Sequence, residues 1–560
     1  MSVVRHCTTI AIVTALAVTG CGLFVSDPDH VGAAQGAGAG AGNATATAGT
    51  GDAGGPLETG GAASAGGAGG LLTSAAGGVA TSGGSAASAA AGAPPIGVPT
   101  GPDTDPDCAG AVNIENDLKV YAGGVHSLVA NALADLTIYT TSNALADLRC
   151  LQSVGGSLSI ELKSGGLEAL GRLRSIGGDL TITGNATIQN LSAFRSLGSV
   201  GGNLVIEDNA ALQDLSGSLL GYVGTGVAIQ GNAALTSLHG LEGLDMLQTL
   251  SIGKSPLLAS LDGLSNLSGH PRSVEIASNA ALSSVAALHG LQSIDILTVT
   301  DNDSLVTLTG LSITRMNALY LSGNPKLRDL AGLEQVTQLG GTELTDNSTL
   351  ENIDALAQLS ELSSFSVAGS PSLSNLEGLS HVTSVESLTI ESCGVTTLNG
   401  LRSVESIDSL VLLDTRIKDL IGLGKASVNQ LELDGNSALT SLAGLSSINQ
   451  DIANLTVANN PELVDLSGLS MVHSIAQEFK LDSNVLLASL AGLEHLTSVD
   501  SFTLLNHPAL TSLASLVSLD RITGRASFSD NPKLSNCAIQ QLVTACSATR
   551  VELENNGPCN

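Results

Sequence analysis

The sequence predicts a solenoid, a fold in which one short unit is repeated and each copy buries its apolar side against its neighbours. A pattern of leucines recurs about every 23 residues from residue 136 to residue 555, without a gap. One such unit cannot bury its apolar face alone, so it must stack. Aromatic residues make up only 2% of the 560 residues and Trp is absent, as expected where bulky rings would disturb the spacing of identical layers.

Each unit reads Leu-x-Ile/Leu/Val-x-x-Asn-x-x-Leu-x-x-Leu-x-Gly-Leu, as in residues 297–311, 319–333 and 431–445. The Leu-x-Ile segment predicts a short strand: Leu180 and Ile182 point inward, whereas Thr181 points out. The segment Leu-x-x-Leu-x-Gly-Leu predicts a return by turns or short 3₁₀ pieces. We therefore predict a right-handed leucine-rich-repeat solenoid with a single parallel β-sheet, of the α/β horseshoe or β-helix-like kind.

An asparagine follows the predicted strand in most units, and its inward side chain is expected to bind the backbone of neighbouring turns. These asparagines are Asn185, Asn209, Asn232, Asn279, Asn302, Asn324, Asn347, Asn436, Asn460, Asn484 and Asn531. Ser255, Ser370, Thr415 and His507 occupy the same position in other units. Cys393 does so too. Leucine-rich repeats accept Cys at this site, so we interpret Cys393 as structural rather than as a reactive or metal-binding thiol.

Residues 1–20 have the features of an export signal. Arg5 precedes an apolar run over residues 8–18, which is too short to span a bilayer as a helix. Residues 18–21, Val-Thr-Gly-Cys, resemble the signal motif of bacterial lipoproteins, with Cys21 as the lipidated first residue. An ordinary secretory signal that ends near a cysteine is the alternative.

The lipoprotein resemblance also implies a location. In Gram-negative lipoproteins an Asp after the lipidated Cys tends to retain the protein at the inner membrane, and this chain has Gly22 there. The resemblance therefore implies an anchor in the outer membrane of a Gram-negative cell envelope. We expect the N-terminal lipid to be the sole contact with the membrane.

Composition divides the rest of the chain. Residues 21–105 are rich in Gly, Ala and Ser, with no apolar period, and predict a disordered N-terminal tether. Its stretch from residue 31 to residue 104 should have a root-mean-square reach of about 45–50 Å. Residues 106–157 should hold an N-terminal cap and the first repeats, residues 158–530 the main array of repeats, and residues 531–560 a C-terminal cap. A terminal layer needs a cap because one of its sides has no neighbour.

Cysteines cluster at the two predicted caps, where an exported protein can use disulfides. Cys108 and Cys150 lie at the first, and we predict that they pair. At the other end Cys546 shares a helical spacing with Ile539, Leu542 and Val543, so we expect it to point into the core. That assignment leaves Cys537 and Cys559 as the expected second disulfide.

Part of the repeat array resembles the receptor L-domain, the leucine-rich β-helical module of insulin and epidermal growth factor receptors. The segments that carry the resemblance are CLQSVGGSLSI (150–160), SIGGDLTITGN (175–185) and SVGGNLVIEDN (199–209). The Asn-Pro turns at 324–325 and 531–532 and the NPKLSNC…NNGPC end are similar too. The central units equally resemble internalin-type repeats, and no motif matches the ligand residues of the receptors.

The sequence does not group the polar residues that a catalytic site requires. The ten His are scattered along the chain, and the repeats contain no HExxH, Cys-x-x-Cys or Gly-x-Ser-x-Gly motif. We therefore predict no enzymatic activity, no cofactor and no metal site. The formal charge of −30 argues against nucleic acid as a partner, because the phosphates would be repelled.

The outward face of the predicted sheet is the best candidate for binding, since stacked strands form a broad rigid surface. On it we single out an aromatic residue, Tyr320, and a mixed patch of Val411, Leu413, Glu432 and Asp434. We predict a lipid-anchored surface scaffold that recognises a protein or a glycan on this face without catalysis. The alternative is a structural or adhesive envelope lipoprotein without a defined ligand.

Overall fold

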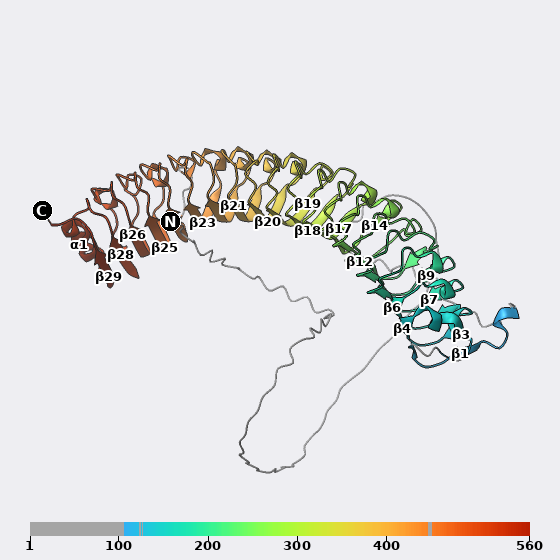
Figure 1. Ribbon diagram of the computed structural model, residues 1–560. Helices are drawn as coiled ribbons and strands as arrows, with labels where there is room; N and C mark the ends of the chain where they lie inside the picture. Colours follow the sequence, from blue (N-terminus) through green and yellow to red (C-terminus); the bar gives the residue numbers. More distant parts are fainter. Residues whose placement is uncertain (1–105, 122–124, 126, 446–450, 560) are drawn as a thin grey trace, which may run out of the picture. The chain divides into compact units, whose positions relative to one another are not determined.

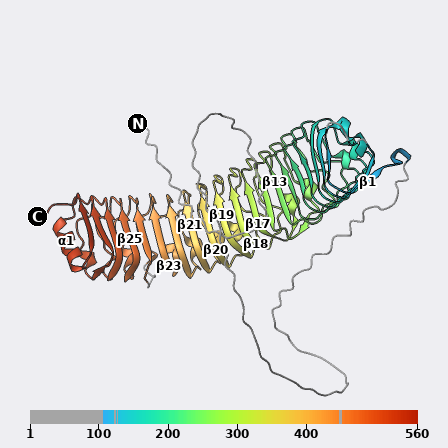
Figure 2. The ribbon, with the colours of Figure 1, turned by 90° about the horizontal axis from the view of Figure 1, so that it is seen from below.

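The computed structural model describes residues 106–560, except for 122–124, 126, 446–450 and 560. The signal, Cys21 and the linker of residues 21–105 lie outside the described residues. The described repeats belong to one compact unit, in which short strands stack in parallel (Figures 1 and 2). The strands lie along one side of the stack, and turns and 3₁₀ segments lie along the other (Figure 1). This arrangement confirms the predicted leucine-rich-repeat solenoid.

A long parallel sheet runs through the whole stack, and neighbouring strands follow the order of the chain. Its strands are β2 (Leu118–Val120), β4 (Leu136–Thr141), β6 (Leu158–Ser164), β8 (Leu180–Thr183), β10 (Leu204–Glu207), β12 (Gly226–Gln230), β13 (Thr249–Gly253), β15 (Ser273–Ala277), β17 (Ser293–Thr300), β18 (Arg315–Ser322), β19 (Gln338–Thr345), β20 (Glu361–Ala368), β21 (Ser384–Glu391), β22 (Ser406–Leu413), β23 (Ser427–Asp434), β24 (Asn454–Ala458), β25 (Ser474–Asp482), β26 (Ser498–Leu505), β28 (Arg525–Ser529) and β29 (Arg550–Glu554). The two-residue strand β27 (Arg521–Ile522) also pairs with β26.

The pairing keeps equivalent residues of successive units side by side. Leu297 of β17 pairs with Leu319 of β18, and Thr342 of β19 and Phe365 of β20 occupy the equivalent position in the next two units. These side chains are buried, so each unit places one side chain in the same layer of the core. The register follows from the alternation of the strand, because a slip by one residue would turn the apolar set to solvent.

A second, shorter parallel sheet lies beside the long one in the first units. Its six strands are β1 (Val112–Ile114), β3 (Val129–Ala132), β5 (Ser153–Val154), β7 (Ser175–Ile176), β9 (Ser199–Val200) and β11 (Tyr222–Val223). A further pair comprises β14 (Ser268–Gly269) and β16 (Gly290–Leu291). These strands add to the predicted sheet, and the segments that resemble the receptor L-domain contain three of them.

A glycine corner joins the two sheets in these units. A Cβ atom on Gly177 would lie 2.0 Å from the carbonyl oxygen of Gly155 in the previous unit, and Gly201 and Gly224 have the same relation to the glycine before them. Successive backbones therefore touch at the corner, and a side chain has no room there. The Gly-Gly dipeptides of the sequence thus mark the place where the chain turns from one sheet into the other.

From β17 onward most units have one longer strand in place of the corner. The strand begins about four residues before the predicted Leu-x-Ile segment. In β18 the buried residues are Met316, Leu319 and Leu321, so Asn317 and Ala318 are two consecutive residues that do not face the core. The chain changes direction at this irregularity, as it does at the glycine corner in the first units. The two consecutive residues also add side chains to the outward face.

The opposite side of the stack consists of turns and short 3₁₀ helices, as predicted. The 3₁₀ segments are η1 (Pro106–Cys108), η2 (Ser142–Leu148), η3 (Glu168–Leu170), η4 (Ser192–Phe194), η5 (Asp262–Leu264), η6 (Ala286–Leu288), η7 (Asp354–Leu356), η8 (Glu377–Leu379), η9 (Asn399–Leu401), η10 (Ile421–Leu423), η12 (Ser467–Leu469) and η13 (Ala514–Leu516). Leucines from both sides fill a core that continues through all units. Among the described residues no helix is long and apolar enough to cross a membrane.

The repeated asparagines form a ladder inside the stack. Asn302 is fully buried, and its Oδ1 accepts a hydrogen bond from the backbone N–H of Asn279 in the previous unit at 3.1 Å. Its Nδ2 donates to the carbonyl oxygens of Ile276 at 3.0 Å and Thr300 at 2.8 Å. One side chain thereby satisfies backbone groups of its own unit and of its neighbour, as the sequence pattern predicted.

Three consecutive units replace the asparagine of the ladder with Ser370, Cys393 and Thr415, all buried. The thiol of Cys393 donates to the carbonyl of Glu391 at 3.1 Å and contacts that of Val367 at 3.7 Å. Burial raises the pKa of this thiol to about 11, so it stays protonated at neutral pH. These features agree with a structural role, because the thiolate is the reactive form.

Disulfides hold both ends of the stack. Cys108 bonds to Cys150, and Cys537 bonds to Cys559, which are the pairs predicted from the sequence. At the C-terminal end α1 (Asn536–Ala545) covers the core with Ile539 and Val543, and Cys546 is a buried free thiol, as expected from its spacing.

The glycine corner yields a test of the packing. We expect Gly177→Ala to destabilise the first units by about 1–3 kcal/mol, because the new methyl group would overlap the Gly155 carbonyl. Gly198→Ala is the matched control, since the nearest atom to its Cβ would be 3.9 Å away. Urea unfolding followed by circular dichroism measures both. Equal midpoints for the two variants would contradict the close contact.

Candidate functional site on the strand face

The outward side chains of the long sheet form straight rows across the stack, because the strands pair in register. The central row contains Thr181, Val205, Ala228, Ser251, Glu275, Thr298, Tyr320, Glu343, Ser366, Thr389, Val411, Glu432, Thr456, Lys480 and Thr503. We call the surface made by these rows the strand face. Small polar residues predominate on it, and carboxylates are spread among them.

The predicted mixed patch exists on this face. Val411 pairs with Glu432, and Leu413 pairs with Asp434, across β22 and β23. All four side chains are half-buried. Burial raises the pKa of the Glu432 carboxyl, the neighbouring charge of Asp434 raises it further, and Lys480 acts in the opposite direction. The patch therefore combines two aliphatic side chains with a carboxyl group that is less acidic than usual.

Tyr320 lies apart from this patch. It is on β18, four strands before Val411, which corresponds to about 19 Å along the stack. Tyr320 is 40% exposed, and its neighbours in the row are Thr298 and Glu343. The structure does not bring the five predicted binding residues together into one site.

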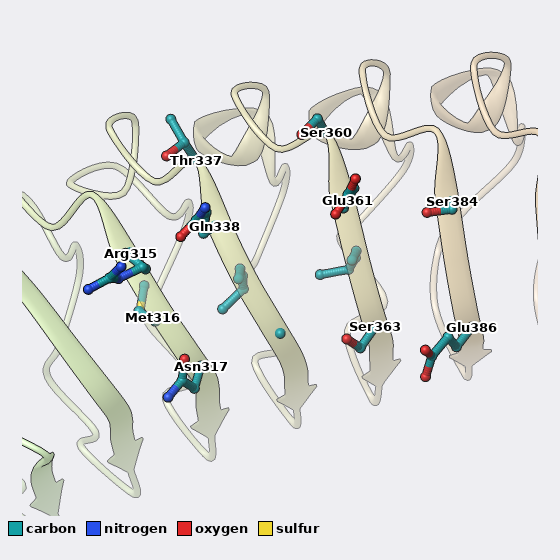
Figure 3. Close-up of a pocket in the computed structure, with 13 residues that line it drawn as sticks. Arg315, Met316, Asn317, Thr337, Gln338, Ser360, Glu361, Ser363, Ser384 and Glu386 are labelled. Atoms are coloured by element: carbon teal, nitrogen blue, oxygen red, sulfur yellow. The ribbon is translucent and has the colours of Figure 1, made fainter. Parts of the chain in front are cut away.

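The strand face is hollowed where the first halves of β18, β19, β20 and β21 lie side by side. The hollow has a volume of about 660 Å³ (Figure 3). Gly340 and Ser363 form a low middle because their side chains are absent or short. Arg315, Gln338 and Glu361 stand in one row along its edge (Figure 3). A second row contains Gly340 and Ser363, with Asn317 and Glu386 at its two ends (Figure 3). We call this hollow the strand-face groove.

The groove offers a guanidinium group, two amides, hydroxyls and two carboxylates within one open surface. Such a set can donate and accept hydrogen bonds toward a hydroxyl-rich or amide-rich ligand. The sequence analysis did not identify this groove. The sequence feature that could have indicated it is Gly340-Gly341, followed one unit later by Ser363-Ser364, which places small residues side by side. These residues precede the predicted start of the strand in their units, so they were not considered as part of the strand face.

The described residues contain no group of three or more His, Cys, Asp or Glu side chains arranged to hold a metal ion. One buried titratable group interrupts the asparagine ladder instead. His507 is fully buried, its backbone N–H donates to Asn531 at 3.0 Å, and its Nδ1 has no hydrogen-bond partner among the described residues. Burial lowers the pKa of His507 to about 4, so the ring is neutral at pH 7.

Several solved structures are similar to this chain in fold. No protein-family model matches the sequence, and no curated protein does. An internalin from Listeria monocytogenes is 14% identical over 74% of this chain and 84% of that chain, with a TM-score of 0.27. A leucine-rich-repeat protein of Leptospira interrogans is 16% identical over 56% of this chain and 93% of that one, also with a TM-score of 0.27.

A third similar structure is the functional domain of another Listeria monocytogenes internalin, whose description includes a cysteine ladder. It is 18% identical over 68% of this chain and 75% of that chain, with a TM-score of 0.20. With TM-scores this low, we base no functional argument on these likenesses. The leucine-rich-repeat fold rests on the repeats and the sheet of this chain.

His507 makes stability depend on pH. Its pKa is about 4 in the folded chain and near 6.5 when exposed, so the unfolded chain binds more protons between these values. We therefore expect the free energy of unfolding to fall by about 3 kcal/mol as pH decreases from 6.5 to 4. His507→Asn should remove this loss. Urea unfolding at pH 7 and pH 4.5, with hydrogen exchange at residues 484–531, measures it.

His507→Asn carries the side chain found at the same position in most units, so its fold should be retained. Equal losses of stability in the two proteins between pH 7 and 4.5 would show that other groups control the acid response.

Proposed function

We propose that this protein is a non-catalytic recognition scaffold that binds a protein or a glycan on its strand face. The main support is the strand-face groove, the polar hollow of about 660 Å³ in the strand face. Neighbouring strands hold its side chains in register, so the groove is formed before any ligand arrives. A preformed surface loses less conformational freedom on binding than a loop does.

The chemistry of the groove favours a ligand with many hydroxyl or amide groups. Arg315, Gln338 and Glu361 form one row of side chains, and Asn317 and Glu386 lie at the two ends of the next row. Tyr320 is exposed on the same strand as Arg315 and can add an aromatic contact next to the groove. The Val411–Leu413 patch would extend the contact to a larger partner.

We further propose that a lipid on Cys21 anchors the protein to the outer membrane of a Gram-negative cell, with residues 21–105 as a tether. The sequence of residues 18–21 and the position of Gly22 support this proposal. The acidic charge of −30 disfavours nucleic acid as the ligand.

The proposed ligand site can be tested by filling the groove. We expect Ser363→Arg to weaken binding about tenfold or more, because a long cation would occupy the middle of the groove. The probe is a soluble chain with Cys21→Ser, used in affinity capture from envelope extract, secreted proteins and a glycan panel. Each saturable hit is then titrated against wild type and variant.

Val517→Arg is the matched control for this experiment, because it adds the same side chain at a residue that is 78% exposed on the return side of the stack. Loss of binding in both variants would contradict a site in the groove. Absence of any saturable partner would instead favour the structural or adhesive envelope lipoprotein without a defined ligand.

The anchor has a separate test. Cys21→Ser should move the protein from the membrane fraction to the soluble fraction, because the serine cannot carry the thioether-linked lipid. Fractionation with metabolic labelling by a palmitate analogue measures both the location and the lipid. A labelled or membrane-bound Cys21→Ser protein would rule out this anchor.

A further inference from the structure

The last strand of the long sheet, β29, has an open edge. It pairs with β28 on one side, and in the described residues no strand lies on the other. The backbone N–H of Asp530 donates to the carbonyl of Glu554 at 3.0 Å, so Glu554 directs its backbone groups toward β28. Because these groups alternate along a strand, Val551 and Leu553 direct theirs toward the open edge.

The side chains of Val551 and Leu553 are also incompletely covered. They pair with Ala526 and Phe528 of β28, which are fully buried, whereas Val551 is 39% exposed and Leu553 is half-buried. The two residues line a hollow of about 510 Å³ together with Val543 of α1. In every earlier unit the next unit covers these positions, so the last unit leaves an apolar strip open.

The outward side of β29 is charged in an order that complements itself. Arg550 begins the strand and Glu554 ends it, with Glu552 in the middle. In an antiparallel pair of two β29 strands centred on Glu552, Arg550 of each copy lies opposite Glu554 of the other. Glu552 already forms an ion pair with Arg525 of its own copy, which offsets the approach of the two central carboxylates.

We propose that two copies of this chain associate through β29, as an antiparallel edge-to-edge pair that joins their long sheets. In this register Val551 of one copy faces Leu553 of the other, and both direct their backbone groups toward the partner. They therefore form the hydrogen-bonded pairs of an antiparallel ladder, and Glu552 forms the non-hydrogen-bonded pair at the two-fold axis. The apolar strips of the two copies cover each other.

Other registers fit less well. A pair centred on Leu553 would place Glu552 opposite Glu554, and like charges directly opposite each other are unfavourable. A pair centred on Val551 would leave Glu554 outside the strand pair. The register centred on Glu552 uses all five residues of β29 and pairs each Arg550 with a Glu.

The first experiment measures association of the unlipidated chain with Cys21→Ser by sedimentation velocity over a range of concentrations. We expect a reversible monomer–dimer equilibrium. Arg550→Glu should weaken it about tenfold, since it places two carboxylates opposite each other at both ends of the pair. The double variant Arg550→Glu with Glu554→Arg should restore it, because the exchanged charges again lie opposite each other.

A cross-link tests the register independently. Glu552→Cys places a thiol at the two-fold axis, where opposite Cα atoms lie about 4.5 Å apart, within the range that a disulfide spans. Mild oxidation should therefore yield a covalent dimer. Glu554→Cys is the control, because its thiol would lie opposite residue 550 of the other copy and far from the equivalent thiol there.

Sedimentation as a monomer at all concentrations would overturn the proposal. So would a double variant that associates no better than Arg550→Glu, or equal cross-linking of Glu552→Cys and Glu554→Cys. Circular dichroism of each variant verifies that the fold is retained, and the cross-link remains informative where a charge reversal disturbs the last strand.

Discussion

The rest of the structure depends on one buried polar contact, the asparagine ladder. The backbone that follows each strand must leave its sheet inside an apolar core, and its N–H and C=O groups need partners there. An inward asparagine supplies both a donor and an acceptor, and it reaches the unit before it, as Asn302 reaches Asn279 and Ile276. This contact helps to align each unit with its neighbour, and the alternation of buried and outward residues along the strands supports the same register.

The surface available for binding follows from that alignment. Because equivalent residues lie side by side, a small residue repeated in neighbouring units produces a hollow, and a charged residue repeated there produces an edge. The strand-face groove arises in this way from Gly340 and Ser363 with Gln338 and Glu361 around them. Functional variation thus resides in outward positions that the core does not constrain.

The ends of the stack obey the same physics with the opposite result. Repetition creates an unsatisfied layer at each end, since the final unit has the apolar and backbone groups of the others without a neighbour. The Cys108–Cys150 disulfide strengthens the first end, and α1 with the Cys537–Cys559 disulfide covers most of the last core. The covering is incomplete at β29, where Val551 and Leu553 remain partly exposed and support the proposed association of two copies.

The sequence by itself determined the fold class, the period and the inward asparagines, because each depends on local alternation or on residues that recur at a fixed spacing. It predicted the two disulfides as well, because the cysteines cluster at the two ends of the repeat array. It also identified Val411, Leu413, Glu432 and Asp434 as neighbours, since they occupy equivalent positions of adjacent units. Only the tertiary structure decided where the strands begin, why the first units have a second sheet and where the groove lies. These features depend on contacts between units, such as the approach of Gly177 to Gly155, which no single repeat contains.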